Sequence, residues 1–352
     1  PKAYFLAKLT YPTAYVLDRT TVETGGRSWW IDTPVGTGPF KLTEYRIGER
    51  IVLERNEDFY RDPPSVNKVV MNLAGGQAMA MYENDEIDIT GVGLFDLDRV
   101  LDPNEPLNKE LVIAQPGFSI AYIGFNTEKA PFDDVKFRQA LNHAIDKDLI
   151  AREVLSELVK PAYGILPPSF PGYNPEIKGL EYDQELAKNL LSQSKYADPE
   201  SRPRIVITVP GTGGVIGLDL EVIIAMWENT LGVEVEISQV EWATYLDDLD
   251  AKKMQAYAGL GWQADYPDPQ DFLDILFHSE SSINHGNFNN SAVDKLLEEA
   301  RIEPDIVQRI ALYNDAERLI VQEAAWVPLW FDGEQYALIK QYVTGYELTP
   351  MI

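Results

Sequence analysis

A strand, a glycine loop, a helix and a second strand follow one another between residues 204 and 240, and this order limits the possible folds more than any other feature of the chain. The four segments read RIVITVP, GTGGVIG, LDLEVIIAMWENTLG and VEVEISQV. A helix is the usual connection between parallel strands, whereas antiparallel neighbours need only a short turn. We therefore predict an α/β lobe with a partly parallel sheet.

Helix and strand patterns continue on both sides of this unit. Residues 135–155 carry Phe137, Leu141 and Ile145 at helical spacing, and residues 160–175 contain too many prolines for regular structure. A chain of 352 residues is long enough for about two domains. Further strands are predicted at 50–56, 68–74 and 326–343, and further helices at 183–193, 291–301 and 307–324.

The charge of the chain argues against a nucleic-acid partner. Thirty Lys and Arg residues stand against 56 Asp and Glu residues, and the resulting net charge of −26 repels phosphate groups. The chain has no cysteine, which excludes disulfides, thiolate metal sites and cysteine nucleophiles. No apolar run reaches the roughly 18 residues that a membrane-spanning helix needs.

Local motifs for cofactors, metals and catalysis are incomplete. The glycine loop at 211–217 departs from the G-x-G-x-x-G spacing, and His143, His278 and His285 do not have the spacing of a metal site. Residues 117–121 lack the second glycine of a nucleophile elbow. We expect no cofactor, no metal site and no enzyme activity. A glycoside hydrolase with paired carboxylates stays open as the enzymatic alternative, because the chain is rich in acids.

Four aspartates stand three residues apart in ADYPDPQDFLD: Asp265, Asp268, Asp271 and Asp274. A calcium loop of the EF-hand type has its ligands at every second residue and a central glycine, and this segment has neither. The pattern instead predicts a turn followed by a helix that starts near Pro269. Asp268 and Asp271 are expected as turn and cap residues.

Seven segments, spread over nearly the whole chain, agree with one family in their order. They are PVGTGPFKL (34–42), ERIVLERNEDFY (49–60), NDEIDIT (84–90), IGFNTEKAPFDDVKFRQALNHAIDKDLI (123–150), GWQADYPDPQDFL (261–273), NFNNSAVDKLLEEA (287–300) and AERLIVQEAAWVPLW (316–330). In these segments the chain resembles the family-5 extracellular solute-binding proteins, the peptide-binding components of ABC importers.

The resemblance implies a two-lobe periplasmic-binding-protein-like α/β fold of type II, cluster C. Residues 1–119 and 327–352 would form the remainder of the first lobe and residues 120–326 the second lobe, with a hinge near 120–126 and 327–331. Members of the family carry a longer region ahead of the GTGPF segment. The chain therefore resembles a C-terminal fragment without part of the first lobe and without the additional small domain, and we expect it to bind ligand weakly by itself.

The resemblance also implies a ligand site. Peptide-binding members hold the α-ammonium group of the peptide on the aspartate of a W-x-A-D-Y type segment, and Asp265 stands at that position. Trp262 and Tyr266 would supply apolar walls with polar tips. Gly259 stands where some members carry an arginine near the ligand, so the chain departs from their pattern for a ligand carboxylate.

The implied function is delivery of oligopeptides to an ABC permease by a monomeric periplasmic or extracellular protein, with room for a lipid anchor in the region ahead of this chain. Oligosaccharide-binding members of the same family use aromatic platforms, and this chain has seven Trp and 18 Tyr residues. An oligosaccharide therefore stays open as the alternative ligand.

Overall fold

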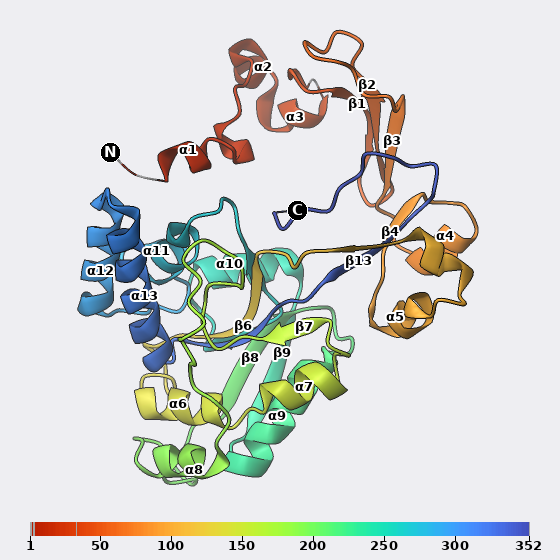
Figure 1. The fold of residues 1–352 in the computed structure, drawn as a ribbon. Coiled ribbons are helices and arrows are strands. Elements are labelled where there is room, and N and C mark those ends of the chain that lie inside the picture. Colours follow the sequence, from red (N-terminus) through yellow and green to blue (C-terminus); the bar gives the residue numbers. More distant parts are fainter. Residues whose placement is uncertain (1, 3, 33, 352) are drawn as a thin grey trace.

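The structure, a computed structural model, describes residues 2, 4–32 and 34–351 and contains three sheets (Figure 1). The largest has seven strands, in the order β7-β12-β6-β10-β8-β9, with β11 paired to β6. Its strands are β6 (Ser119–Phe125), β7 (Val159–Pro161), β8 (Ile205–Pro210), β9 (Val235–Val240), β10 (Ala256–Tyr257), β11 (Gly261–Gln263) and β12 (Trp326–Asp332).

The predicted parallel unit is present in this sheet. β8 pairs in parallel with β9, and helix α9 (Leu218–Leu231) connects them. β8 also pairs in parallel with β10, whereas β6 pairs antiparallel with β10, β11 and β12. The prediction of a partly parallel sheet in an α/β lobe is therefore confirmed.

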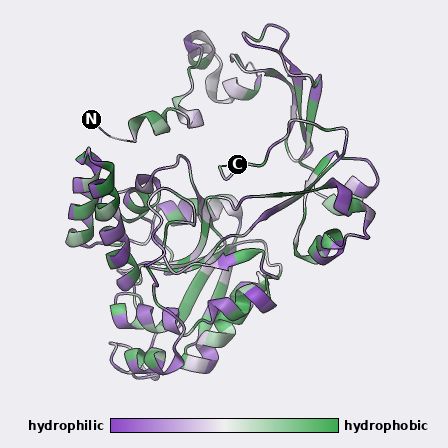
Figure 2. Cartoon of the chain, in the orientation of Figure 1, coloured by the Kyte–Doolittle hydropathy of each residue, from purple (hydrophilic) through white to green (hydrophobic). Residues whose placement is uncertain are grey.

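Helices cover both faces of the large sheet and bury two separate cores. Side chains alternate along a strand, so Ile120 and Tyr122 of β6 enter one core while Ile123 and Phe125 enter the other. In Figure 2 the strands of the large sheet are mainly hydrophobic, and the surrounding helices show hydrophilic as well as hydrophobic residues. The first core lies under α10 (Trp242–Asp250), α11 (Leu273–Phe277), α12 (Ser291–Ile302) and α13 (Ile306–Gln322), and the second under α6 (Val135–His143), α7 (Lys147–Glu153), α8 (Gln184–Ser192) and α9.

Two predicted elements are wrong in their extent. The helix expected over 135–155 is divided into α6 and α7, because the Asp146 carboxylate accepts the Leu149 N–H at 2.9 Å and starts a new helix. The strand expected over 326–343 is divided into β12 and β13 (Gln335–Ile339), which belong to different sheets. Gly333 lies between them, where a Cβ would be only 2.5 Å from the Leu158 carbonyl oxygen.

The two smaller sheets are antiparallel. The first, β1-β2-β3, follows the N-terminal helices, and the second, β4-β13-β5, places a strand from near the C-terminus between two strands from the first third of the chain. Their elements and the associated helices are α1 (Phe5–Lys8), α2 (Arg19–Thr24), α3 (Trp29–Asp32), β1 (Phe40–Arg46), β2 (Arg50–Arg55), β3 (Lys68–Asn72), α4 (Ala78–Glu83), β4 (Ile89–Gly91), α5 (Leu94–Leu101) and β5 (Leu111–Ala114).

The residues expected at the hinge form paired strands in the large sheet. β6 and β12, which carry most of 120–126 and 327–331, pair with each other. Residues 115–118 and 333–334 lie outside the strands and lead to β5 and β13, which enter the second small sheet (Figure 1). The division into lobes stays a prediction. Within the described ranges, no helix combines the length and the apolar character needed to cross a bilayer.

A buried ion pair attaches α13 to the turn that follows β11. Two guanidinium nitrogens of Arg309 donate to the Asp268 carboxylate at 2.9 and 2.6 Å, and both residues are buried. The Asp268 carboxylate also caps the short helix η4 (Pro269–Asp271) by accepting the Gln270 N–H at 3.0 Å. Removing one member of such a pair leaves the other charge buried without compensation.

We expect Arg309→Met to lower the free energy of unfolding by about 3 to 5 kcal/mol. The matched control is Arg318→Met on the same helix, since Arg318 makes an exposed pair with Asp315 at 2.8 Å and should lose less than about 1 kcal/mol. Urea denaturation of both variants measures the difference. Equal losses in the two variants would show that the buried pair does not stabilise the turn.

Candidate functional site

Asp265 lies in the turn between β11 and η4, at the edge of the large sheet. β11 pairs with β6, which fixes the start of this turn, and the Asp265 N–H donates to the Asp271 carboxylate at 2.8 Å. The Asp265 side chain is half-buried. Burial raises the pKa of its carboxyl group, while the nearby Tyr11 hydroxyl and Lys8 ammonium group lower it.

The N-terminal segment thus supplies a cation to the predicted anchor. The Lys8 ammonium group also lies 5.2 Å from the centre of the Tyr266 ring and 5.1 Å from that of Tyr4. Sequence analysis missed Lys8 and Tyr11, because residues about 250 positions away from Asp265 share no local pattern with it. Only the tertiary structure brings them together.

The other two predicted site residues, Trp262 and Tyr266, make their contacts within the protein. Trp262, on β11, packs against the core under α10 to α13, and its Nε1 atom is buried without a hydrogen-bond partner among the described residues. Tyr266 is only 3% exposed, and its hydroxyl donates to the Gln270 side chain. The structure therefore brings Asp265 and Tyr266 together beneath Lys8, with the Tyr266 hydroxyl turned toward η4.

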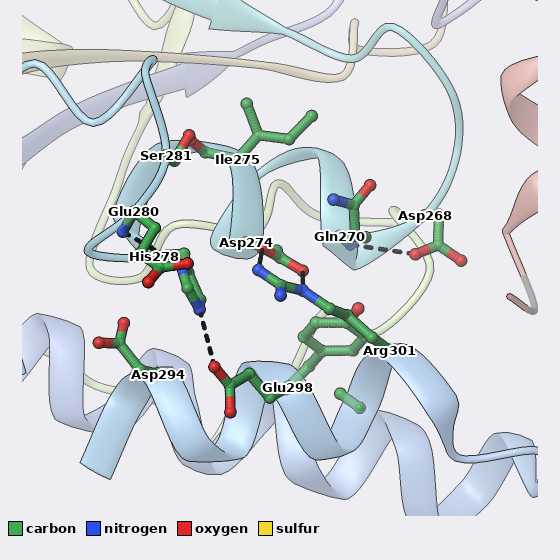
Figure 3. A network of polar contacts seen from close by, with 12 residues as sticks. Asp268, Gln270, Asp274, Ile275, His278, Glu280, Ser281, Asp294, Glu298 and Arg301 are labelled. Atoms are coloured by element: carbon green, nitrogen blue, oxygen red, sulfur yellow. Dashed lines mark hydrogen bonds and ion pairs between the residues drawn. The ribbon is translucent and has the colours of Figure 1, made fainter. Parts of the chain in front are cut away.

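The neighbouring aspartates have separate partners. Figure 3 shows the contact of Asp268 with Gln270 and that of Asp274 with Arg301. Asp268 caps η4, as predicted, and Asp274 forms two contacts of 2.7 Å with Arg301. The predicted helix near Pro269 is present as η4 followed by α11. Asp271 serves the turn and is not a cap, because its side chain reaches back to the Asp265 N–H.

Asp271 is the most deeply buried of the four aspartates. It has no exposed surface, and burial raises the pKa of its carboxyl group to about 7. The Asp265 charge raises this pKa further, while the Asp265 N–H, the Trp262 indole and Lys8 lower it. The indole is close but out of hydrogen-bonding geometry, since Trp262 Nε1 and Asp271 Oδ1 are both without a partner in the described part of the chain.

A cavity of about 460 Å³ lies next to β11. Gly259 on its wall has φ +78°, and a Cβ at this position would lie 2.9 Å from Pro210 Cδ. A larger residue is therefore strained here. The cavity is lined by residues of β6, of the loop after β8, of the first turn of α9 and of the segment before β11, chiefly Ala121, Pro210, Val215, Gly217, Asp219, Gln239, Gly259, Leu260 and Gly261.

The histidines are separate from one another. His278 Nε2 lies 3.4 Å from a Glu298 oxygen (Figure 3), and His285 Nε2 lies 3.2 Å from an Asp250 oxygen. In residues 2, 4–32 and 34–351, no three His, Asp or Glu side chains are placed to hold a metal ion together.

Comparison of the sequence with protein families gives a match over residues 1–284 to "Bacterial extracellular solute-binding proteins, family 5 Middle". Heme-binding protein A of Haemophilus influenzae is 33% identical over 325 residues, which are 90% of this chain and 58% of that protein. The periplasmic oligopeptide-binding protein OppA of Salmonella typhimurium is 30% identical over 359 residues, which are 98% of this chain and 64% of that protein. The chain thus spans less than two thirds of these relatives.

Solved structures agree in fold. DppA of Helicobacter pylori in complex with the peptide STSA superposes with a TM-score of 0.83 at 27% identity, over 97% of this chain and 67% of that one. The murein tripeptide binding protein MppA of Escherichia coli gives a TM-score of 0.85 at 27% identity, over 100% and 68% of the two chains. The expected periplasmic-binding-protein fold is confirmed, and the chain belongs to the family-5 bacterial extracellular solute-binding proteins.

Proposed function

We propose that the protein binds oligopeptides in the periplasm or outside the cell and delivers them to an ABC permease, without catalysing a reaction. The observation that carries this proposal is the half-buried carboxylate of Asp265, a residue whose backbone N–H donates to the Asp271 carboxylate. A cavity of about 460 Å³, lined by other residues, lies next to the preceding strand β11. Relatives named as oligopeptide-binding and dipeptide-binding proteins support the ligand class.

Asp265 is suited to receive the α-ammonium group of a peptide. Its desolvation is unfavourable unless a cation compensates it, and the nearby Lys8 shows that an ammonium group can approach this carboxylate. A charge-assisted hydrogen bond from the ligand would replace water at the carboxylate. Tyr266 and Trp262 would form the apolar surroundings that strengthen this interaction.

The cavity beside β11 is proposed to hold a peptide side chain. Gly259, Leu260 and Gly261 line the cavity, and Asp265 comes two residues after the end of β11. One short segment therefore contains both the proposed ammonium anchor and part of the cavity wall. Its lining is mostly apolar, with Asp219 and Gln239 as polar members. Such a pocket favours large apolar side chains without strict selection.

The proposal includes two lobes that close on the ligand, namely residues 1–119 with 327–352 and residues 120–326. Among the described residues, two short connections lead from the large sheet to the second small sheet, at 115–118 and 333–334. A few residues in such connections can absorb the rotation of one lobe against the other. We also propose that the protein is a monomer.

The alternatives predict different ligands. A glycoside hydrolase would need two carboxylates that reach the substrate, but Asp271, which is next to Asp265, has no exposed surface. Turnover of chromogenic glycosides by the pure protein would support that alternative.

The second alternative is an oligosaccharide ligand. Native mass spectrometry of the protein as its host produces it distinguishes peptide binding from oligosaccharide binding, since peptides and hexose oligomers give different series of co-purifying masses.

Replacing Asp265 by Asn should weaken the binding of a free-amine peptide by about 2 to 5 kcal/mol at pH 7, because the ligand ammonium loses its counter-charge. Isothermal titration calorimetry on the protein as its host produces it measures this loss. The N-acetylated form of the same peptide serves as the control, and its affinity should hardly change. If the wild-type protein binds both forms equally, Asp265 is not the ammonium anchor.

Replacing Val215 by Trp tests the cavity. Val215 is 88% exposed at its wall, so a larger side chain can obstruct the cavity without disturbing the core. We expect peptides with a large apolar side chain to lose affinity at least about tenfold, and glycine-rich peptides to keep theirs. The matched control is Val307→Trp, at a position 74% exposed on α13. Equal effects on both peptides, or in both variants, would contradict the assignment.

A further inference from the structure

Asp271 is placed to control the carboxylate that we propose as the ligand anchor. One of its oxygens, Oδ2, accepts the Asp265 N–H at 2.8 Å, which fixes the backbone from which the Asp265 side chain projects. Its other oxygen, Oδ1, is buried and lacks a hydrogen-bond partner among the residues that the structure describes. The side chain as a whole has no exposed surface.

The partners of the neighbouring charges leave Asp271 in an unusual position. Asp268 is neutralised by Arg309 and Asp274 by Arg301, whereas the described part of the chain contains no ion pair that involves Asp271. Three groups favour its charged form: the Asp265 N–H, the Trp262 indole and, at longer range, the positive charge of Lys8. The ionisable groups that face it or its immediate neighbours are Asp265, Asp268 and Tyr266 from the turn, Lys8 and Tyr11 from the N-terminal segment, Arg309 from α13 and Asp274 with Arg301.

We propose that Asp271 is a positioning residue for ligand binding. It holds Asp265 through its N–H and adds a second negative charge behind it, so that the ligand's ammonium group contacts Asp265 alone but is attracted by both carboxylates. This inference rests on the proposed function of Asp265. It concerns a residue that does not touch the ligand, because Asp271 is fully buried.

The pair makes binding dependent on pH. In the free protein the pKa of Asp271 is about 7, so near pH 5.5 this residue is neutral and at pH 8 it is mostly charged. A bound ammonium group favours the charged form, and by linkage the charged form favours the ammonium group. Affinity for a free-amine peptide therefore rises as the pH increases through the pKa of Asp271.

The variant Asp271→Asn separates charge from position. The asparagine carbonyl oxygen can still accept the Asp265 N–H, but the side chain stays neutral at every pH. We expect the ratio of wild-type to variant affinity for one free-amine peptide to be close to one at pH 5.5 and about tenfold at pH 7.5. Titration of the ligand's own amine, whose pKa is about 7.7 to 8.0, affects both proteins equally and cancels in the ratio.

Calorimetry on the protein as its host produces it, from pH 5.5 to 7.5, carries out this test. A ratio that stays constant or falls with increasing pH overturns the inference. For the N-acetylated peptide the ratio should remain constant, and a rise for that peptide as well would show that the effect does not involve the ammonium group. Asp315→Asn, which removes the same charge from an exposed position on α13, should give a constant ratio.

A measurement without ligand reports the integrity of the variant. Because the folded-state pKa of Asp271 is above that of an unfolded aspartate, about 3.9, wild-type stability falls relative to Asp271→Asn as the pH rises from 5 to 8. Thermal denaturation should show this trend, and its absence would contradict the buried environment on which the inference rests.

If Asp265→Asn retains the full preference for free amines, the proposed function fails. If Asp265→Asn loses that preference while Asp271→Asn keeps the wild-type pH profile, only this inference fails.

Discussion

The backbone of β6 forms pairs along both of its edges, with β12 on one side and with β10 and β11 on the other. This arrangement joins residues about 200 positions apart and places a central strand between the two cores. It also fixes the start of the turn that carries Asp265, because β11 pairs with residues 119–121 at the beginning of β6. The candidate site is therefore positioned by β6, the strand that pairs with both β11 and β12.

Burial and ion pairing distinguish the four aspartates of the turn. Asp268 and Asp274 have arginine partners, and an aspartate that is already paired and buried gains little from a second cation. Asp271 is enclosed. Asp265 alone among the four is partly accessible and lies opposite a lysine that is not part of its own element. Four equally spaced residues of one type thus have four different roles, which arise from the packing of α12, α13 and the N-terminal segment.

The sequence was sufficient for features that depend on local order. The unit of β8, α9 and β9 follows from apolar spacing, and the resemblance of seven segments indicates the family and its fold. The break between α6 and α7 was also visible in principle, since Asp146 is followed by helix-forming residues as an N-cap is. The approach of Lys8 and Tyr11 to Asp265 was not predictable, because it depends on how the N-terminal segment lies against the turn after β11.

The distinction between Asp268 and Asp271 lies outside any pattern of spacing for the same reason, since it depends on a residue of α13. Periodicity predicts which side of an element faces the core, but it does not predict which side chain of another element contacts that side. Arg309 is 41 positions from Asp268, and the length of the intervening chain gives no information about their contact. Burial and pairing of polar groups therefore had to come from the structure.

The net charge of −26 would not by itself account for the proposed selectivity for an ammonium group. A field of that kind attracts every cation, including inorganic ions and exposed lysines, and it is screened beyond about 8 to 10 Å at ordinary salt concentrations. Selectivity instead requires a carboxylate whose hydration is incomplete, so that a cation with hydrogen-bond donors and a fitting apolar neighbour is favoured over a hydrated ion. Asp265 is half-buried and its backbone N–H is held by Asp271, and in the proposed function the cavity next to β11 binds a side chain of the ligand. An acetylated amine would desolvate the Asp265 carboxylate without adding a positive charge, and this unfavourable state is the physical basis of the proposed discrimination.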